Sequence, residues 1–454
     1  MKLLVLNGSP KGDVSVTMQY VKFIRKKFPE HEYQVLNISY EIQRIERDEG
    51  VFGTVIDAVR SADAVLFAFP LYTLLVPAQY KRFIELVFER RVQDVFRGKY
   101  TAALSTSIRF FDQLAHAYLR EVCDDLGMQY VGFYSAAMYD LLEEKEQERL
   151  ASFARLFFRA VSQRVPTRPE NAPVVRQDFV YEPGPVIRAG SSGTRKVLIL
   201  TDSMDPVSNL AKMADRLRQG FGGSVELINL HDIDMRGGCL GCCQCGYDNT
   251  CVYKDGFRDF FLKKVLPADI VVLAGTVTDR YLSSRWKMYF DRSFFLGHTP
   301  KYAGKQLGFL ISGPLRQVPS LREALFAIAD VSQANSLVVT DEVPSSAELD
   351  ALLDAMVTRL EACSEESYIR PRTFFHEGGF KIFRDNIYGG MRVAFQADYA
   401  YYRKHKLFDF PQKDLRTRLF NAVIVPLTRV PAIRRKAFAD LRYRMIEPIG
   451  KVVR

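Results

Sequence analysis

The sequence predicts two consecutive α/β domains followed by a basic, aromatic extension. In each predicted domain, five short apolar runs alternate with helical patterns, which favours a doubly wound, five-stranded parallel sheet. A segment rich in Pro and Gly, residues 166–194, separates the two series, and we interpret it as a linker. We therefore expect domains at residues 1–165 and 195–365, and a mainly helical extension at residues 366–454.

The first series begins at the N-terminus. Its apolar runs are short and nearly continuous, which is typical of strands buried on both faces of a parallel sheet. The expected strands are residues 3–6, 33–38, 64–69, 100–105 and 130–134, and the clearest helical patterns are residues 17–27, 78–88 and 112–126.

The second series repeats the first. Its expected strands are residues 196–201, 224–229, 269–275, 306–312 and 336–340, with helical patterns at residues 209–219 and 284–295. Residues 79–84 correspond in role to residues 285–290. The sequence therefore contains an internal repeat of a whole domain, with a period of about 200 residues.

The loop after the first expected strand is rich in hydroxyl groups. Ser9, Lys11, Ser15 and Thr17 lie between this strand and the next helix. Ligands of open parallel sheets bind beyond the carboxyl ends of the strands, and backbone N–H groups at a helix start can hold a phosphate. An ordinary N-capped turn explains the same composition. The loop lacks the GxGxxG and Walker patterns, which argues against a dinucleotide or P-loop site.

Residues 7–11 and 15–17 resemble the start of the flavodoxin-like NADPH-dependent FMN reductases. In that family this loop holds the FMN phosphate, so the resemblance implies that role for Ser9, Lys11, Ser15 and Thr17. It also implies a flavodoxin-like fold for residues 1–160 and NAD(P)H as the reductant. Pro70, Leu71 and Tyr72 resemble the family's second flavin loop.

The second half has residues at the corresponding positions. Ser203, Ser208 and Asn209 stand where the phosphate loop is expected, and Thr276 and Thr278 stand where the isoalloxazine loop is expected. Thr278, Asp279 and Arg280 replace the Pro-x-Tyr pattern of the family. This departure leaves open whether one or both domains bind FMN.

Five of the seven cysteines lie between Cys239 and Cys251. Cys239, Cys242 and Cys245 are spaced three residues apart and Cys251 follows after a short loop, which suits the four thiolates of a [4Fe–4S] cluster. Zinc, which more often takes two separated C-x2-C pairs, and a structural or disulfide role without metal are the alternatives. Cys243 is interpreted as a bystander.

This spacing, and the run from Cys251 to Phe257, resemble the iron–sulfur flavoprotein family. Its members carry FMN and a [4Fe–4S] cluster and exchange electrons with ferredoxin-type carriers. The resemblance assigns ligand roles to Cys239, Cys242, Cys245 and Cys251. We expect the cysteines at the carboxyl edge of the second sheet, near the flavin of that sheet.

Three further side chains have two interpretations each. Arg280 and Lys287 suit either a phosphate contact or a solvated helix face, and His116 is either a proton donor near the flavin or a partly buried helix residue. No Ser-His-Asp order, H-E-x-x-H motif or carboxylate pair indicates a hydrolase.

The net charge of +10 is concentrated near the C-terminus. Residues 370–454 contain 19 Lys/Arg and 7 Asp/Glu, out of 63 and 53 in the chain, so the first 369 residues contain 44 and 46 and are nearly neutral. Fourteen Phe and Tyr in the same segment argue against a disordered tail. The segment has three interpretations: a solvated layer, a dock for an acidic carrier such as ferredoxin, or a peripheral membrane contact.

The patterns together predict a cytoplasmic, FMN-dependent oxidoreductase that passes electrons from NAD(P)H or ferredoxin to an unknown acceptor through a [4Fe–4S] cluster. A homo-oligomer is expected and nucleic acid is not, because no DNA-reading motif is present. No run of about 18 apolar residues predicts a membrane span. The alternative is a non-catalytic redox sensor or scaffold with a degenerate flavin site.

Overall fold

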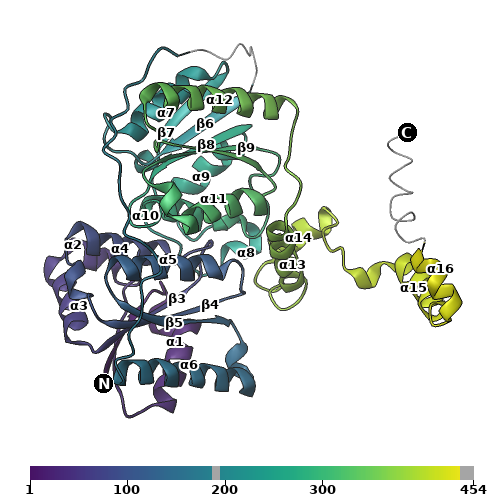
Figure 1. The fold of residues 1–454 in the computed structure, drawn as a ribbon. Coiled ribbons are helices and arrows are strands. Elements are labelled where there is room, and N and C mark those ends of the chain that lie inside the picture. Colours follow the sequence, from purple (N-terminus) through teal and green to yellow (C-terminus); the bar gives the residue numbers. More distant parts are fainter. Residues whose placement is uncertain (187–194, 440–454) are drawn as a thin grey trace. The chain divides into compact units, whose positions relative to one another are not determined.

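The computed structural model describes residues 1–186 and 195–439 (Figure 1). Residues 187–194 of the predicted linker and residues 440–454 of the predicted extension lie outside the described residues. The chain divides into two compact units, Met1–Tyr399 and Ala400–Arg454. The first unit contains both sheets.

The first sheet confirms the five strands expected from the first apolar runs. All its pairings are parallel, in the order β2-β1-β3-β4-β5, which is the strand order of the flavodoxin-like fold. The strands are β1 (Lys2–Asn7), β2 (Glu32–Leu36), β3 (Ala64–Pro70), β4 (Tyr100–Ser107) and β5 (Gln129–Ala137).

Helices cover both faces of this sheet (Figure 1). They are α1 (Val16–Lys27), α2 (Ile42–Arg47), α3 (Glu49–Ser61), α4 (Ala78–Glu89), α5 (Asp112–Asp125) and α6 (Glu144–Ser162). Apolar residues of α1 and α6 pack on one face of the sheet, against alternate strand residues such as Val5 and Leu66. The other face is covered by α3, α4 and α5, because successive side chains of a strand point to opposite faces.

The second sheet is also parallel throughout, in the order β10-β9-β8-β6-β7. Taken from its other edge, β7-β6-β8-β9-β10, this order is the same as that of the first sheet. Its strands are β6 (Lys196–Thr201), β7 (Ser224–Asn229), β8 (Ile270–Thr276), β9 (Gln306–Ser312) and β10 (Asn335–Thr340). Its helices are α7 (Asn209–Gly220), α8 (Cys245–Asp248), α9 (Phe257–Phe260), α10 (Ser284–Arg292), α11 (Pro319–Val331) and α12 (Ser346–Glu365). Both halves are therefore flavodoxin-like, as predicted.

A single hydrophobic cluster joins the two sheets. It contains buried side chains of α3, α4 and α5 from the first half and of α9, α10 and α11 from the second. Across the junction α4 packs against α10 and α5 packs against α11. These are corresponding helices, since α4 and α10 follow the central strands β3 and β8, and α5 and α11 follow β4 and β9.

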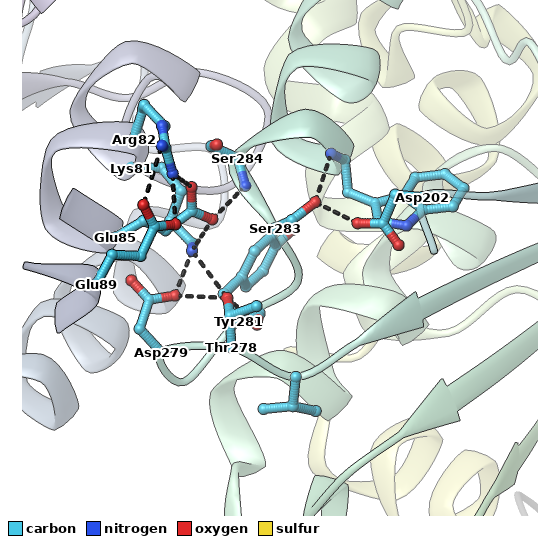
Figure 2. Close-up of polar contacts among 12 residues, drawn as sticks. Lys81, Arg82, Glu85, Glu89, Asp202, Thr278, Asp279, Tyr281, Ser283 and Ser284 are labelled. Carbon is cyan, nitrogen blue, oxygen red and sulfur yellow. Dashed lines mark hydrogen bonds and ion pairs between the residues drawn. The ribbon is translucent and has the colours of Figure 1, made fainter. Parts of the chain in front are cut away.

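Polar contacts across this junction are reciprocal. The Ala78 N–H, at the start of α4, donates to Asp291 Oδ2 at 2.9 Å, and the Ser284 N–H, at the start of α10, donates to Glu85 (Figure 2). Ala78 corresponds to Ser284, and Glu85 to Asp291. Such mutual exchange is the pattern of a two-fold symmetric interface, formed here within one chain.

The described part of the linker contains no helix or strand and packs on both halves. The Asn171 side chain donates to Asp124 Oδ2 at 2.9 Å, and the Tyr181 N–H donates to Asn209 Oδ1 at 2.8 Å. Arg176 donates to the Val277 carbonyl.

The C-terminal region is helical where it is described. Its helices are α13 (Phe374–Tyr388), α14 (Gln396–Lys404), α15 (Leu415–Leu427) and α16 (Pro431–Ala439). Helical patterns in the sequence predict helices at residues 390–404 and 415–424. The first of them begins only at Gln396 and the second continues to Leu427, whereas α13 was not predicted. Helix α13 packs on α11 within the first unit. No helix of the described chain combines the length and apolarity that a membrane crossing requires.

Candidate functional site

The first predicted phosphate loop runs from the end of β1 to the start of α1. Ser15 is the N-cap of α1 and accepts a hydrogen bond from the Met18 N–H at 3.2 Å. Ser9, Ser15 and Thr17 are buried, and Lys11 is exposed. The structure therefore brings these four predicted residues together at one helix N-terminus.

Close packing fixes this loop. A Cβ on Gly8 would lie 2.8 Å from the Tyr80 ring and 2.9 Å from Phe69 Cβ, so only Gly fits directly after β1. The Thr17 and Thr106 hydroxyls are 2.6 Å apart and tie the loop to β4. First-turn N–H groups have no acceptor inside a helix, so this hydroxyl-rich helix start suits the phosphate of FMN.

The second predicted flavin loop follows β3. The Leu71 N–H donates to the Thr106 carbonyl at 3.1 Å, and the Tyr72 carbonyl accepts from Lys287 Nζ of the second half at 2.8 Å. Burial, with the nearby Cys239, raises the pKa of Tyr72 well above its ordinary value. Its hydroxyl is therefore neutral at physiological pH and able to donate a hydrogen bond.

The Cys loop, defined here as residues 239–251, lies against this first-half site. The Gln79 side-chain N–H donates to the Cys239 carbonyl at 3.1 Å. A Cβ on Gly241 would lie 1.7 Å from the Tyr72 hydroxyl oxygen and 3.3 Å from Lys11 Cε. The loop was expected near the flavin of its own sheet; it also reaches across the junction to the phosphate loop and Tyr72 of the other half.

The five thiols of the Cys loop share one small cavity. It measures about 20 Å³ and is closed by Arg292, Phe294 and Phe295, which leaves room for about one water molecule. Within residues 1–186 and 195–439, no three His, Cys, Asp or Glu side chains are arranged to hold a metal ion. A [4Fe–4S] cluster does not fit the thiols as they stand.

As free thiols, Cys239, Cys243 and Cys245 are protonated at neutral pH. Burial raises the pKa of Cys239 and of Cys245 to about 12. Burial also raises the pKa of Cys243, against the opposing effect of Lys11. A thiolate would therefore need a compensating positive charge.

The predicted residues of the second half border a larger cavity of about 1170 Å³. Ser203, Ser208, Thr276 and Thr278 line it. The facing wall comes from the first half, through Ser39, α2 and α4. Leu240 of the Cys loop also lines it, so the Cys loop borders the second-half site as well.

The phosphate loop of the second half is acidic. Its hydroxyls are engaged internally, since Ser203 and Ser208 both donate to the Asp205 carbonyl, at 3.1 and 2.7 Å. Asp202 stands where the first half has Gly8, and it accepts a hydrogen bond from Ser283 (Figure 2). Burial raises the pKa of Asp202 to about 6. Two carboxylates and no cation at residues 201–209 repel a phosphate, so this loop does not fit FMN.

Asn209 has another use in the structure. Its side-chain N–H groups donate to the Phe179 carbonyl at 2.7 Å and to Asp341 at 3.1 Å, and its oxygen accepts from Tyr181. The other predicted second-half residues line the cavity, whereas Asn209 is not among its lining residues.

The cations singled out from the sequence form buried ion pairs. Arg280 donates to Asp125 at 2.5 and 2.7 Å, and Lys287 pairs with Asp291. Both side chains are buried, so the solvated helix face is wrong for both. Arg280 lines the larger cavity, and its contact with a phosphate stays a prediction. Burial lowers the pKa of His116 to about 4. This histidine is neutral, stacks on Phe133 at 4.1 Å and binds Ser105 Oγ at 2.8 Å.

Two polar side chains on the cavity wall were missed in the sequence. The Ser39 hydroxyl and Gln79 Oε1 are buried without a hydrogen-bond partner in the described structure, and both residues line the second-half cavity. Unpaired buried polar atoms are rare and costly, and a polar ligand in the cavity would satisfy them. Neither residue belongs to a sequence motif. Each lines the cavity only because the two halves pack together, and the sequence gives no signal for that.

Comparisons with known proteins agree with the first-half site. Residues 1–139 match the family described as NADPH-dependent FMN reductase. No curated protein matches the chain. Solved structures similar to parts of it include the flavoenzyme NAD(P)H:(acceptor) oxidoreductase FerB of Paracoccus denitrificans, with 22% identity over 36% of this chain and 97% of that chain and a TM-score of 0.31.

Two further solved structures are similar to parts of the chain. The FMN-dependent NADH-azoreductase of Bacillus anthracis has 17% identity over 36% of this chain and 98% of that chain, with a TM-score of 0.27. The NAD(P)H:quinone oxidoreductase of Methanothermobacter marburgensis has 16% identity over 37% and 98%, with a TM-score of 0.28. Residues 1–139 therefore match the NADPH-dependent FMN reductase family in sequence, and their strand order is that of the flavodoxin-like fold.

Proposed function

We propose that this chain is an FMN-dependent oxidoreductase that holds one FMN, in its first half, and takes electrons from NAD(P)H. The observation that carries the proposal is the placement of the Cys loop of the second half against Tyr72, Lys11 and Gln79 of the first. The second half then covers and completes the first-half site, while its own acidic phosphate loop leaves it without FMN.

Residues of this chain have distinct tasks in the proposed reaction. When bound, FMN accepts a hydride from a reduced nicotinamide and passes on one or two electrons. Ser9, Ser15, Thr17 and the α1 N-terminus hold the phosphate, and Lys11 adds a positive charge. Pro70, Leu71 and Tyr72 form the wall beside the ring.

The Cys loop excludes water from this wall. Gln79 fixes the Cys239 carbonyl and Lys287 fixes the Tyr72 carbonyl, so loop and wall are held by hydrogen bonds from both halves. The Tyr72 hydroxyl, which is neutral because of its burial, is a donor for a polar atom of a ligand at this wall.

A visible spectrum and FMN determination on anaerobically purified protein test the proposal. We expect an oxidised-flavin spectrum, one FMN per chain after reconstitution, and bleaching by NADPH or NADH. Lys11→Met should weaken FMN binding about tenfold, since one charge-assisted contact is lost. The matched control, Lys26→Met, changes an exposed lysine on α1 and should leave binding unchanged. A colourless protein that does not take up FMN would refute the proposal and favour the redox-sensor or scaffold alternative.

A [4Fe–4S] cluster on Cys239, Cys242, Cys245 and Cys251 is a second candidate. The spacing of these four cysteines favours it, although the cavity between the thiols is too small for a cluster unless the loop rearranges. Iron and sulfide analysis of anaerobic protein distinguishes the cases: about four of each per chain supports the cluster, and zinc or no metal removes it. Exchange with ferredoxin, homo-oligomerisation and a cytoplasmic location stay predictions.

A further inference from the structure

Helices α15 and α16 present an unusual number of apolar side chains to solvent. Their nine large exposed apolar residues have exposed fractions from 39% to 73%, and no residue of α15 is buried. Soluble monomers rarely expose continuous apolar surface of this extent. The residues are Leu415, Leu419, Phe420, Val423, Ile424, Val425, Leu427, Val430 and Ile433.

Basic residues flank this apolar segment on both sides. Arg416 and Arg418 precede its longest apolar run, and Arg429 and residues 434–436 follow it. Between Leu415 and Ala439 there are six Lys/Arg and no Asp or Glu. From Leu419 to Leu427 the only polar side chain is that of Asn421.

A partner for this segment must supply apolar surface and negative charge together. A second copy of the first 369 residues lacks the charge, because 44 Lys/Arg balance 46 Asp/Glu there. An anionic lipid bilayer supplies both, since its headgroups attract the cations and its acyl boundary accepts apolar side chains. We propose that residues 415–436 bind the chain to anionic membrane surfaces.

The length of α15 determines how it binds. Its 13 residues span about 20 Å at 1.5 Å per residue, less than the roughly 30 Å of a hydrocarbon core. The helix therefore lies along the interface, with its apolar side chains inserted and the flanking arginines at headgroup level. Flavin binding at residues 9–17 is not involved, so the proposal stands or falls separately from the proposed enzymatic function.

Vesicle cosedimentation of the full-length protein tests the proposal. One vesicle type contains phosphatidylcholine alone and the other contains phosphatidylcholine and phosphatidylglycerol at 7:3. We expect binding only to the anionic vesicles, weakened at least tenfold between 0.1 and 0.5 M salt, because the Debye length shortens. Phe420→Asp/Val423→Asp should abolish binding, and Arg434→Gln/Arg435→Gln should weaken it about tenfold or more.

A matched control places the same change on the other unit. Tyr139→Asp/Leu142→Asp alters two side chains that are at least as exposed and should bind vesicles like the unmodified chain. Circular dichroism and flavin content show whether each variant is folded. Absence of binding to anionic vesicles at 0.1 M salt overturns the proposal. So does a dimer in light scattering that Phe420→Asp/Val423→Asp converts to a monomer, since a second copy would then cover the segment.

Discussion

Lys81 is the buried cation on which the junction between the two sheets depends. It is fully buried, and its ammonium lies 3.0 Å from Glu85 Oε1, 3.3 Å from Thr278 Oγ1 and in contact with Asp279 (Figure 2). Burial lowers the pKa of Lys81, but Asp279 and Glu85 outweigh this effect and the pKa is raised. Lys81→Met keeps the length of the side chain and removes the charge.

The expected loss follows from what the variant leaves behind. Removing one partner of a buried ion pair costs about 3–5 kcal/mol because the other charge stays buried and unpaired. Arg82 lies 3.1 Å from the second oxygen of Glu85 and compensates that carboxylate in part, whereas Asp279 keeps no cation. We therefore expect a loss of about 3–4 kcal/mol in the free energy of unfolding.

Urea unfolding followed by tryptophan fluorescence measures this loss. Trp286 is the single tryptophan, is fully buried, and lies on α10 at the junction. Lys26→Met, at an exposed lysine of α1, is the control and should change stability by less than about 0.5 kcal/mol. Lys81→Met/Asp279→Asn should recover at least 1 kcal/mol, since Glu85 keeps Arg82 and no bare carboxylate is left. A fall in the free energy of unfolding of less than about 1 kcal/mol in Lys81→Met would refute the reasoning. A double variant Lys81→Met/Asp279→Asn that is less stable than Lys81→Met would refute it as well.

Three further predictions concern single residues of the two sites. Because the pKa of Asp202 is raised to about 6, the contribution of this residue to stability is greatest in acid and is lost as pH rises through 6. At pH 7.5 the variant Asp202→Asn should thus be about 2–3 kcal/mol more stable than the unmodified chain. Near pH 4 the two proteins should be equally stable, and urea unfolding at both pH values measures the difference. Gly241→Ala should push the Cys loop away from Tyr72 and speed the reaction of its thiols with a disulfide reagent at least fivefold. Gly98→Ala, at a positive φ without neighbours, should not change that rate. Ser208→Ala, in the acidic loop, should leave FMN affinity and stoichiometry unchanged in fluorescence titration.

The central strands were predictable because they are apolar runs bounded by turn residues. Burial on both faces makes a parallel strand continuous in hydrophobicity, so residues such as Ala64 to Phe69 identify β3 without knowledge of their neighbours. The repeat was predictable for the same reason. Helix α13 was missed because Gly378 and Gly379 lie in its middle, where local propensity disfavours a helix.

The junction was not predictable from local patterns. Arg280 and Lys287 look like surface cations in the sequence, and only packing of the two halves buries Arg280 beside Asp125 and Lys287 against the Tyr72 carbonyl. The contact of the Cys loop with the first half could not be predicted for the same reason, since Gln79 and Tyr72 lie about 160 residues before the loop in the sequence. Long-range pairing of this kind leaves no periodic signal.

The two halves share one fold and one interface, yet their corresponding connections differ in length. In the first half, only a short turn with Ser39 and Tyr40 joins β2 to α2. In the second half, the connection from β7 to α9 contains the whole Cys loop. Because the interface is reciprocal, each connection faces the site of the other half. The long connection, with the Cys loop, covers the hydroxyl-rich loop after β1. The short connection leaves a cavity of about 1170 Å³ beside the acidic loop after β6. The two sites are therefore expected to take different ligands, even though their sheets share one strand order.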